Sequence, residues 1–492
     1  MSSAPHSCSL FLPSEEETAR LGRWLARRVR PGDTILLDGP IGSGKTHLAR
    51  ALIRERLRRS EDVPSPTFTL VQTYAADGTE IWHADLYRLS HPDEVAELGL
   101  EDAFETAVCL VEWPDRLGQS APDSALRLRF SAEGDGRRLD VSGGERWAGR
   151  IADLAAEDRA AQSVAFLVRE GWGEAARRFL AGDASARSYD RLTLGAKTAV
   201  LMDAPPGKGE DTGAFVRIAR HLSSLGLSAP RVLAEDGAAG FLLLEDLGDT
   251  LFARLVPQSP DLESTLYAAA VDVLIHLQAH PAPPGLADAS AADWASAAAF
   301  VLDWYRLAIT GERIDTAEFR TRIETAQHAL ADGPRVMILR DYHAENLIWL
   351  PERSGLARVG LLDFQLAQMG QPGYDLVSLC QDARRDVPLA VERAMVLHFV
   401  EAIGVAEADF APAYAMLGAQ RALRILGIFA RLSLVVGKPG YVALIPRVWA
   451  QLQRNLAHPA LAPLAAICGR LLPEPTPDRL ERIRAQCGSH AP

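Results

Sequence analysis

The first part of the fold is decided by the stretch Thr34-Ile-Leu-Leu-Asp38-Gly39-Pro-Ile-Gly42-Ser43-Gly44-Lys45-Thr46. Its opening five residues predict a buried strand, and a helix is expected from about 46 to 58. Between them, the pattern GxxxxGK[ST] is matched at every fixed position. Glycines let backbone N–H groups wrap an anion, Lys45 adds a positive charge, and the Thr46 hydroxyl can ligate Mg²⁺. Strand, loop and helix together predict a phosphate-binding site.

The rest of the first 155 residues continues this α/β pattern. Strands are predicted over residues 67–74, 79–85 and 108–113, and a closing hairpin over 125–130 and 137–141. Residues 142–160 are rich in Gly, Glu, Arg and Ala and carry no strand signal. We therefore predict a P-loop NTPase domain over residues 1–155 and a second domain over 156–492.

Two acidic residues end predicted strands of the first domain, Asp85 and Glu112. Acids at strand ends of an α/β sheet lie where ligands bind. Each can hold Mg²⁺, directly or through water, or orient an attacking water molecule. The pattern leaves the division of these roles open.

Four segments of the first domain make it resemble a known protein family. They are Gly39–Thr46, Ser65-Pro66-Thr67-Phe68-Thr69, Asp85-Leu86-Tyr87-Arg88 and Val111-Glu112-Trp113-Pro114. Over about residues 8–150 the chain resembles TsaE, the ATPase subunit of bacterial threonylcarbamoyladenosine tRNA modification. The resemblance implies ATP hydrolysis that supports a partner complex of TsaB/TsaD-like subunits, without direct RNA chemistry.

The same resemblance implies residue roles. Thr46 and Glu112 would bind Mg²⁺, and Asp85 would be a second acid near the metal, acting in catalysis with Lys45. The implied ATP-binding positions are Thr18, Gly39, Gly42, Ser43, Gly44, Lys45, Thr46, His47, Thr67 and Arg137. Pro40 departs from the family, which usually has Asp there, and proline removes one backbone N–H from the loop.

The second domain begins as a sheet and continues as helices. Residues 188–194 and 197–203 predict a hairpin around the turn Gly195-Ala196. A helix over 215–225 and strands at 232–233 and 241–244 follow, and the chain then becomes mostly helical apart from a β-rich island at 336–364. A small sheet lobe before a large helical lobe predicts a cleft between them, as in an α+β protein-kinase-like bilobal domain.

Asp341, Asn346 and Asp363 form the second candidate site. Asp341 and Asn346 lie in one tight loop after a short apolar stretch, and Asp363 ends another. Phosphoryl transfer to a hydroxyl needs a carboxylate that accepts its proton, and an amide oxygen and a second carboxylate that hold Mg²⁺. The spacing is that of a kinase catalytic loop followed by its metal-binding Asp. We expect His343 to brace the loop.

The stretch 241–248 predicts the connector between the lobes, where the backbone around Glu245 and Leu247 would bind adenine. With segments 182–189, 200–206 and 374–376, it makes residues 160–485 resemble the aminoglycoside-phosphotransferase-like kinases. Within them, the chain looks closest to the AmgK-like kinases of N-acetylmuramate and N-acetylglucosamine. The resemblance implies Asp341 as catalytic base, Asn346 and Asp363 as Mg²⁺ ligands, and Asp375 as an acid that supports the loop.

This domain departs from the kinase pattern in its phosphate contacts. The usual lysine of the third strand should fall near Leu201-Met202, and no lysine is there. Arg187 or Lys197 is expected to replace it. The glycine-rich lid is reduced to Gly182 and small residues, with Ser185 as a phosphate contact.

The acceptor is less well specified. The Trp304–Tyr305 pair either stacks on a sugar ring or packs in the core. The leading hypothesis is a fusion of a tRNA-modification ATPase with an amino-sugar kinase of cell-wall recycling. Two alternatives stay open: a kinase for aminoglycosides, choline-like alcohols or another small hydroxyl acceptor, and an N-terminal domain that is mainly an ATP-gated docking module.

Composition narrows the location and the partners. The 492 residues carry a net charge of −12, which argues against strong nucleic-acid binding or a membrane-surface role. The five cysteines are scattered and fit a reducing, cytoplasmic compartment. No signal peptide is visible, and Arg431 interrupts the longest apolar stretch, 425–437, which favours a buried helix over a membrane span.

Overall fold

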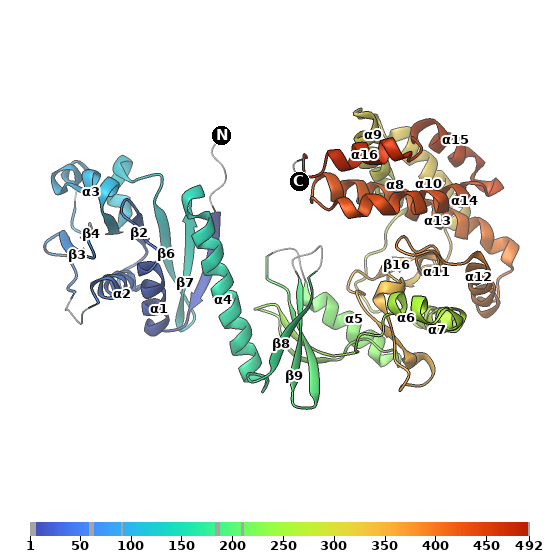
Figure 1. The fold of residues 1–492 in the computed structure, drawn as a ribbon, viewed down its shortest axis with the longest axis horizontal. Helices are drawn as coiled ribbons and strands as arrows, with labels where there is room; N and C mark the ends of the chain where they lie inside the picture. The colour runs from blue at the N-terminus through green and yellow to red at the C-terminus, as the bar shows by residue number, and fades with distance from the viewer. Residues whose placement is uncertain (1–5, 59–62, 90–91, 183–186, 208–210, 491–492) are drawn as a thin grey trace. The chain divides into compact units, whose positions relative to one another are not determined.

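The computed structural model describes residues 6–58, 63–89, 92–182, 187–207 and 211–490 (Figure 1). The chain divides into two compact units, Met1–Arg169 and Glu170–Pro492. The expected boundary after residue 155 lies inside helix α4 (Ala148–Arg169). This helix stays with the first unit because Ile151 and Leu154 belong to that unit's hydrophobic core.

The first unit is built on a seven-stranded sheet of order β1-β7-β6-β2-β5-β4-β3. Strands β6, β2, β5 and β4 run parallel, and the other pairings are antiparallel. The strands are β1 (His6–Leu12), β2 (Thr34–Asp38), β3 (Val71–Ala76), β4 (Thr79–Asp85), β5 (Val108–Glu112), β6 (Leu126–Glu133) and β7 (Gly136–Gly143). The four parallel strands form the centre that the phosphate-binding motif requires.

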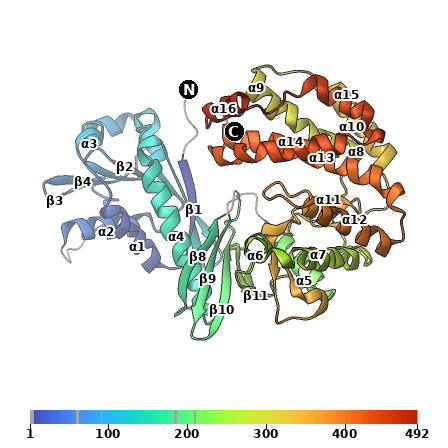
Figure 2. The ribbon, with the colours of Figure 1, turned by 45° about the vertical axis from the view of Figure 1, so that its right-hand side comes forward.

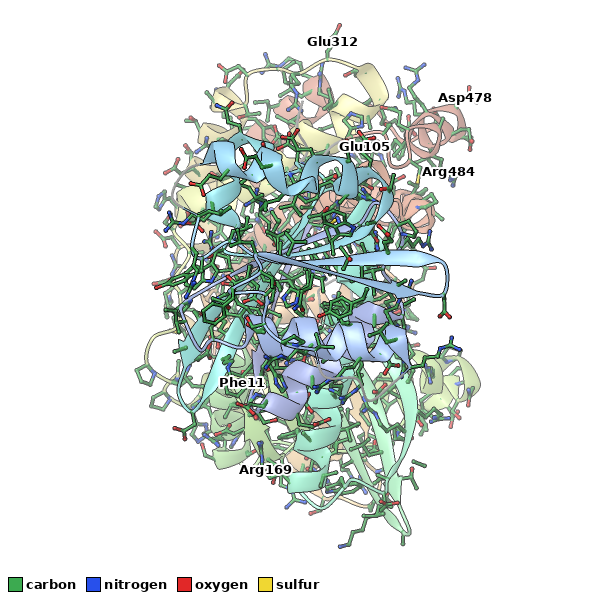
Figure 3. The ribbon with its side chains drawn as sticks, turned by 90° about the vertical axis from the view of Figure 1, so that its left-hand side faces the viewer. Phe11, Glu105, Arg169, Glu312, Asp478 and Arg484 are labelled. Atoms are coloured by element: carbon green, nitrogen blue, oxygen red, sulfur yellow. The ribbon has the colours of Figure 1, made fainter. Side chains whose placement is uncertain are left out.

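Helices α1 (Glu15–Ala26) and α2 (Lys45–Leu57) lie side by side against the sheet (Figures 1 and 2). The Ser14 hydroxyl caps α1 by accepting from the Glu17 amide at 3.2 Å. The short helix α3 (Leu100–Thr106) precedes β5. The β1 strand carries Phe11, which is exposed and is labelled in Figure 3.

The predicted strand over 67–74 begins later, at Val71. Residues 67–70 form a turn in which the Leu70 amide donates to the Pro66 carbonyl at 2.7 Å. Leu70 also has a positive φ of 64°, which is incompatible with a continuing strand. The SPTF segment is therefore a loop that leads into the sheet.

The second unit begins with an antiparallel five-stranded sheet of order β11-β12-β10-β9-β8. The predicted hairpin is β9 (Ser188–Leu194) and β10 (Lys197–Asp203), paired throughout. The other strands are β8 (Ala176–Gly182), β11 (Val232–Asp236) and β12 (Phe241–Glu245). Helix α5 (Thr212–Ser224) buries Phe215, Ile218 and Leu222 in the core that includes Leu242 and Leu244 of β12.

A helical lobe follows this sheet within the second unit (Figure 1). Two small hairpin-like pairs interrupt it, β13 (Val336–Ile338) with β16 (Gln368–Gly370), and β14 (Leu347–Trp349) with β15 (Val359–Leu361). The helices are α6 (Phe252–Gln258), α7 (Glu263–Gln278), α8 (Ala291–Phe300), α9 (Leu307–Thr310), α10 (Ala317–Ala331), α11 (Tyr374–Cys380), α12 (Leu389–Ile403), α13 (Glu407–Leu434), α14 (Ile445–Leu456), α15 (Ala462–Leu471) and α16 (Pro477–Ala485). The predicted apolar stretch at 425–437 is the end of α13 and is largely buried. Across the described ranges, the chain contains no helix with the length and apolarity needed to cross a membrane.

Candidate active sites

The first site lies where β2, β4 and β5 end. Because these strands are parallel, their carboxyl ends meet at one edge of the sheet, and Asp85 is paired in register with Glu112. The phosphate-binding loop leaves the end of β2 at Gly39 and leads into α2. The geometry therefore brings both acids to the loop, as their positions in the sequence predict.

Glycine is required at the start of this loop. Gly39 has a φ of 138°, and a Cβ there would lie 2.7 Å from the Phe130 carbonyl oxygen. Gly42 and Gly44 also have positive φ values, and a Cβ at Gly42 would meet only open space. The Ser43 hydroxyl is buried and has no hydrogen-bond partner among the described residues. A glycine-lined cradle with a spare hydroxyl suits a phosphate group.

Lys45 is folded onto its own loop. Its Nζ donates to the carbonyl oxygens of Gly39 at 2.6 Å and Pro40 at 2.8 Å, and it lies 4.0 Å from the centre of the Trp113 ring. Burial lowers the pKa of Lys45, and the negative charges of Glu112, Asp85 and Asp38 oppose that shift. Pro40 thus lacks an N–H but still holds the lysine through its carbonyl.

Two hydroxyl–carboxylate contacts complete the site. Thr46 Oγ1 donates to Glu112 Oε2 at 2.9 Å, and Thr67 Oγ1 donates to Asp85 Oδ2 at 2.6 Å. These oxygens suit Mg²⁺. The part of the chain that the structure describes contains no group of three or more His, Cys, Asp and Glu side chains able to hold a metal ion.

The remaining predicted residues surround a cavity of about 560 Å³. His47 Nε2 lies 3.0 Å from the Glu15 carbonyl oxygen, and Thr18 Oγ1 donates to the Ser14 carbonyl at 3.2 Å. Arg137 lies beside Gly44. The cavity lining includes Thr18, Gly42, Ser43, Gly44, Lys45, Thr46, His47, Thr67, Asp85, Glu112 and Arg137; Gly39 contributes its carbonyl to Lys45 from outside that lining.

Sequence reasoning missed His83. This side chain is fully buried on β4, and its Nε2 lies 3.0 Å from Glu112 Oε1. His83 precedes Asp85 by two residues, so the alternation of a strand puts both side chains on the same face of β4. That spacing could have identified His83 from the sequence. Glu112 is thus held on one oxygen by Thr46 and on the other by His83.

The second site is a cleft of about 520 Å³ between the two lobes of the second unit. Five predicted residues line it: Glu245, Leu247, Asp341, Asn346 and Asp363. Asn346 Nδ2 donates to the Asp341 backbone carbonyl at 2.9 Å, which fixes the two ends of the loop. The sequence prediction that these groups share one cleft agrees with this geometry.

Asp375 holds the loop from behind. It is fully buried and accepts from the backbone amides of Leu339 at 2.6 Å and Arg340 at 2.9 Å. Arg340 has a φ of 72°, and Asp363 has a φ of 53°. Each left-handed conformation of a non-glycine residue costs about 1–3 kcal/mol. The backbone at Arg340 and at Asp363 is therefore held in conformations that the surrounding structure must stabilise.

His343 has the geometry of a brace. Its Nε2 lies 3.2 Å from Arg384 Nη1 and 3.4 Å from Asn346 Nδ2. Burial, helped by the positive charges of Arg384 and Arg421, holds the pKa of His343 well below its usual value. A neutral imidazole accepts at Nε2 from Arg384 Nη1, the nearer donor, and so helps to keep the loop in place.

The structure distinguishes the two candidates for the missing lysine. Arg187 is buried and its Nη2 lies 3.4 Å from Asp363 Oδ1. Lys197 is exposed at the beginning of β10, at the end of the β9–β10 hairpin opposite to Arg187. Leu201 and Met202 are buried in the sheet lobe. Ser185, the predicted phosphate contact, lies outside the described residues.

At the connector, the Glu245 side chain is turned away to two arginines. Its carboxylate accepts from Arg231 Nε at 3.2 Å and Arg353 Nη2 at 3.0 Å. Leu247 packs in a small apolar cluster with Ile348 and Leu350. The carboxylate of Glu245 is thus occupied by these two arginines.

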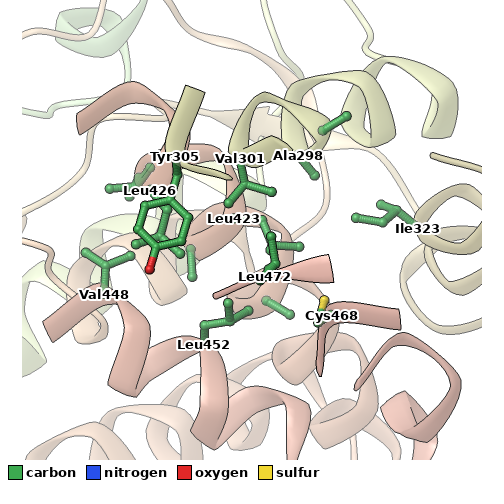
Figure 4. Close-up of a cluster of buried hydrophobic side chains, with 14 of the residues drawn as sticks. Ala298, Val301, Tyr305, Ile323, Leu423, Leu426, Val448, Leu452, Cys468 and Leu472 are labelled. Carbon is green, nitrogen blue, oxygen red and sulfur yellow. The ribbon is translucent and has the colours of Figure 1, made fainter. Parts of the chain in front are cut away.

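Trp304 and Tyr305 do not line the cleft. They lie in a π-helical segment, Val301–Arg306, and Tyr305 is fully buried in the helical core shown in Figure 4. The Tyr305 hydroxyl donates to the Pro473 carbonyl at 2.7 Å. Of the two interpretations of this pair, core packing is the correct one.

The two sites define the chain as a P-loop nucleotide-binding unit joined to a protein-kinase-like phosphotransferase unit. The family model "Threonylcarbamoyl adenosine biosynthesis protein TsaE" matches residues 12–139, and "Phosphotransferase enzyme family" matches residues 176–416. The chain belongs to the TsaE family through its N-terminal unit and to the phosphotransferase family through its C-terminal unit. It is an enzyme, and the predicted fusion and fold classes are confirmed.

Individual relatives match each part. An N-acetylmuramate/N-acetylglucosamine kinase of Caulobacter vibrioides is 39% identical, over 65% of this chain and 98% of that protein. A Pseudomonas aeruginosa protein with the same name is 33% identical, over 62% of this chain and 92% of that protein. The tRNA threonylcarbamoyladenosine biosynthesis protein TsaE of Rickettsia conorii is 38% identical, over 26% of this chain and 73% of that protein.

Proposed function

We propose that the N-terminal unit binds and hydrolyses ATP. The observation that supports this is the glycine cradle with Lys45, beside the carboxylates of Asp85 and Glu112. On binding, phosphate oxygens would replace the loop carbonyls as partners of Lys45. Asp85 and Glu112 are the acids available to orient an attacking water molecule, and Thr46 and Glu112 would hold Mg²⁺. The ion would neutralise charge on the phosphates.

The hydrolysis would support threonylcarbamoyladenosine formation on tRNA by TsaB/TsaD-like subunits. The names of the relatives of this unit support this assignment. The alternative is an ATP-gated docking module, in which the segment 65–69 changes conformation with nucleotide. The contact of Thr67 with Asp85 at the site supports this alternative.

Pull-down of TsaB/TsaD-like subunits with ATP, ADP or no nucleotide tests both roles. A nucleotide-dependent complex with turnover stimulated by the partners supports the ATPase role. A nucleotide-dependent complex with negligible turnover even in the assembly favours the docking role. Equal recovery of the subunits under all three conditions would contradict both.

For the C-terminal unit we propose phosphorylation of the anomeric hydroxyl of N-acetylmuramate or N-acetylglucosamine, a step of cell-wall recycling. Asp341 would accept the hydroxyl proton while the sugar oxygen attacks the γ-phosphorus of ATP in line. The bond from that phosphorus to the β–γ bridging oxygen breaks, and ADP leaves. Asn346 and Asp363 would hold Mg²⁺, which stabilises charge on the phosphoryl oxygens.

The position of Asp341 beside Asn346, in one cleft with Asp363, supports phosphoryl transfer. The names of the relatives support the amino sugars as acceptors. Assaying the full chain with radiolabelled ATP and each sugar, a panel of aminoglycosides, and choline tests this choice. Labelled sugar 1-phosphate is the expected product. Labelling of an aminoglycoside or of choline instead would establish the alternative acceptor class.

A further inference from the structure

The residues that line the cleft come from two sources. The sheet lobe and the connector supply the end where the nucleotide base would bind, including Glu245 and Leu247. Beyond Asp341, the helical lobe supplies His343, Glu345, Arg384 and Tyr441. An acceptor hydroxyl must lie next to Asp341 to lose its proton, so the body of the acceptor would contact this second set.

The charges of the two ends differ. Asp246 and Asp249 lie at the connector and are ion-paired with Arg191, and Glu245 is ion-paired with Arg231 and Arg353. At the acceptor end, the acid other than Asp341 is Glu345, and Arg384 neutralises it with Nε 2.8 Å from Oε2. The cleft therefore offers an aminoglycoside cation little unpaired negative charge beyond Asp341 at this end.

Contacts to two neighbouring side chains hold the guanidinium group of Arg384 in place and involve only part of it. Glu345 holds its Nε, and His343 Nε2 lies 3.2 Å from its Nη1. Its side chain is 32% exposed, and its Nη2 makes no hydrogen bond to the residues that the structure describes. A guanidinium with a free N–H edge in a ligand cleft is suited to a carboxylate.

Buried positive charge reinforces this end. Arg421 is buried behind the loop and donates to the Gln381 carbonyl at 3.1 Å. The positive charges of Arg384 and Arg421 both act on this end of the cleft, and they favour an anionic group there.

We propose that Arg384 binds the carboxylate of an acidic acceptor sugar and so selects it over its neutral counterpart. The inference rests on the proposed sugar kinase function. N-acetylmuramate carries a lactyl carboxylate that N-acetylglucosamine lacks, so the two sugars differ by the group that Arg384 would recognise. Arg384 is a specificity residue in this role, because the transferred phosphoryl group and the attacking hydroxyl do not involve it.

The test compares kcat and KM of the full chain for both sugars in Arg384→Ala, Arg384→Lys and a control, Arg470→Ala. Arg470 is also ion-paired, to Glu318, but both side chains are 58% exposed and neither lines the cleft. Loss of a charge-assisted contact should lower kcat/KM for N-acetylmuramate about 10- to 100-fold, mainly through KM. The loss should be clearly smaller with N-acetylglucosamine, for which only the contacts of Arg384 with His343 and Glu345 are removed. Arg384→Lys should retain part of the preference, and Arg470→Ala should match the wild type.

Equal losses with both sugars would overturn the assignment, because they would show that Arg384 only braces His343 and Glu345. No loss with either sugar would overturn it as well. The retained N-acetylglucosamine activity serves as the check on folding. A wild-type chain that phosphorylates neither sugar would overturn the proposed function and this assignment with it, whereas wild-type activity with an unchanged preference overturns the assignment alone.

Discussion

Arg187 Nη2 lies 3.4 Å from Asp363 Oδ1, although the two residues are 176 positions apart in the chain. Arg187 directly precedes β9, and Asp363 follows β15. On the neighbouring strand β10, where kinases carry a phosphate-binding lysine, Met202 is buried in the sheet lobe. A cation therefore reaches Asp363, the proposed Mg²⁺ ligand, from the residue that precedes the adjacent strand β9.

Replacing Arg187 with Ala should weaken ATP binding by the C-terminal unit. If its guanidinium contacts phosphate oxygens, the loss of that contact should raise the KM for ATP about 10- to 100-fold. The KM measured in sugar phosphorylation reports this unit alone, although both units are expected to bind ATP. Lys197→Ala is the matched control and should leave KM unchanged, since Lys197 is exposed at the end of the β9–β10 hairpin opposite to Arg187. Two unchanged values would rule out both residues as the replacement.

Asp341→Ala should abolish sugar phosphorylation. Without a carboxylate to accept the hydroxyl proton, the rate should fall by about 10²- to 10⁴-fold. ATP hydrolysis by the N-terminal unit, measured on the same preparation, should persist. The reciprocal variant, Lys45→Ala, should lose hydrolysis and keep sugar phosphorylation. If either substitution eliminated both activities in a folded chain, the hypothesis of two independent active sites would be contradicted.

His83→Asn should increase the Mg²⁺ concentration needed by the N-terminal ATPase. His83 contacts one oxygen of Glu112 and Thr46 contacts the other. The substitution therefore removes one of the two contacts that orient the carboxylate. Loss of a residue that orients a metal ligand commonly costs about 10- to 100-fold in metal affinity. Titrating the ATPase with Mg²⁺ measures the half-saturation point, and the melting temperature checks that the buried substitution is tolerated. An unchanged half-saturation point would show that Glu112 does not need His83.

The buried carboxyl group of Asp375 should make the free energy of unfolding depend on pH. Burial raises the pKa of Asp375 to about 7, with Asp341 adding to the shift, while the amides of Leu339 and Arg340 and the charge of Arg421 oppose it. The unfolded value is about 4, so between about pH 4 and pH 7 the native state binds a proton that the unfolded state has released. Stability from this group therefore falls as pH rises through that window and is level above it.

Asp375→Asn removes this titration. The melting temperature of the wild type minus that of the variant should be largest near pH 5 and should decrease toward pH 8. Calorimetry at pH 5, 6, 7 and 8, following the transition that the substitution shifts, measures this difference. A difference that stays level from pH 5 to pH 8 would contradict this prediction, because it would mean that the hydrogen bonds from Leu339 and Arg340 keep the carboxylate charged throughout that range.

The local sequence pattern was sufficient to predict an element where residues close in the sequence also pair with one another in the structure. The β9–β10 hairpin was predicted to the residue because its turn and its alternation lie within one short stretch. Strands β1 and β8 were missed for the opposite reason. β1 pairs with β7 near the other end of its unit, and β8 is an edge strand whose residues are all exposed, so neither shows a strong alternation of its own.

The sequence alone determined both phosphate-handling motifs, their order and their residue types, because glycine conformation, strand ends and tight-loop spacing are local properties. Only the tertiary structure decided which of Arg187 and Lys197 reaches Asp363, that His83 holds Glu112, and that Arg384 faces the cleft while Tyr305 is buried. These outcomes depend on which side chains the packed elements bring together across long stretches of chain. Such proximity has no signature in local periodicity.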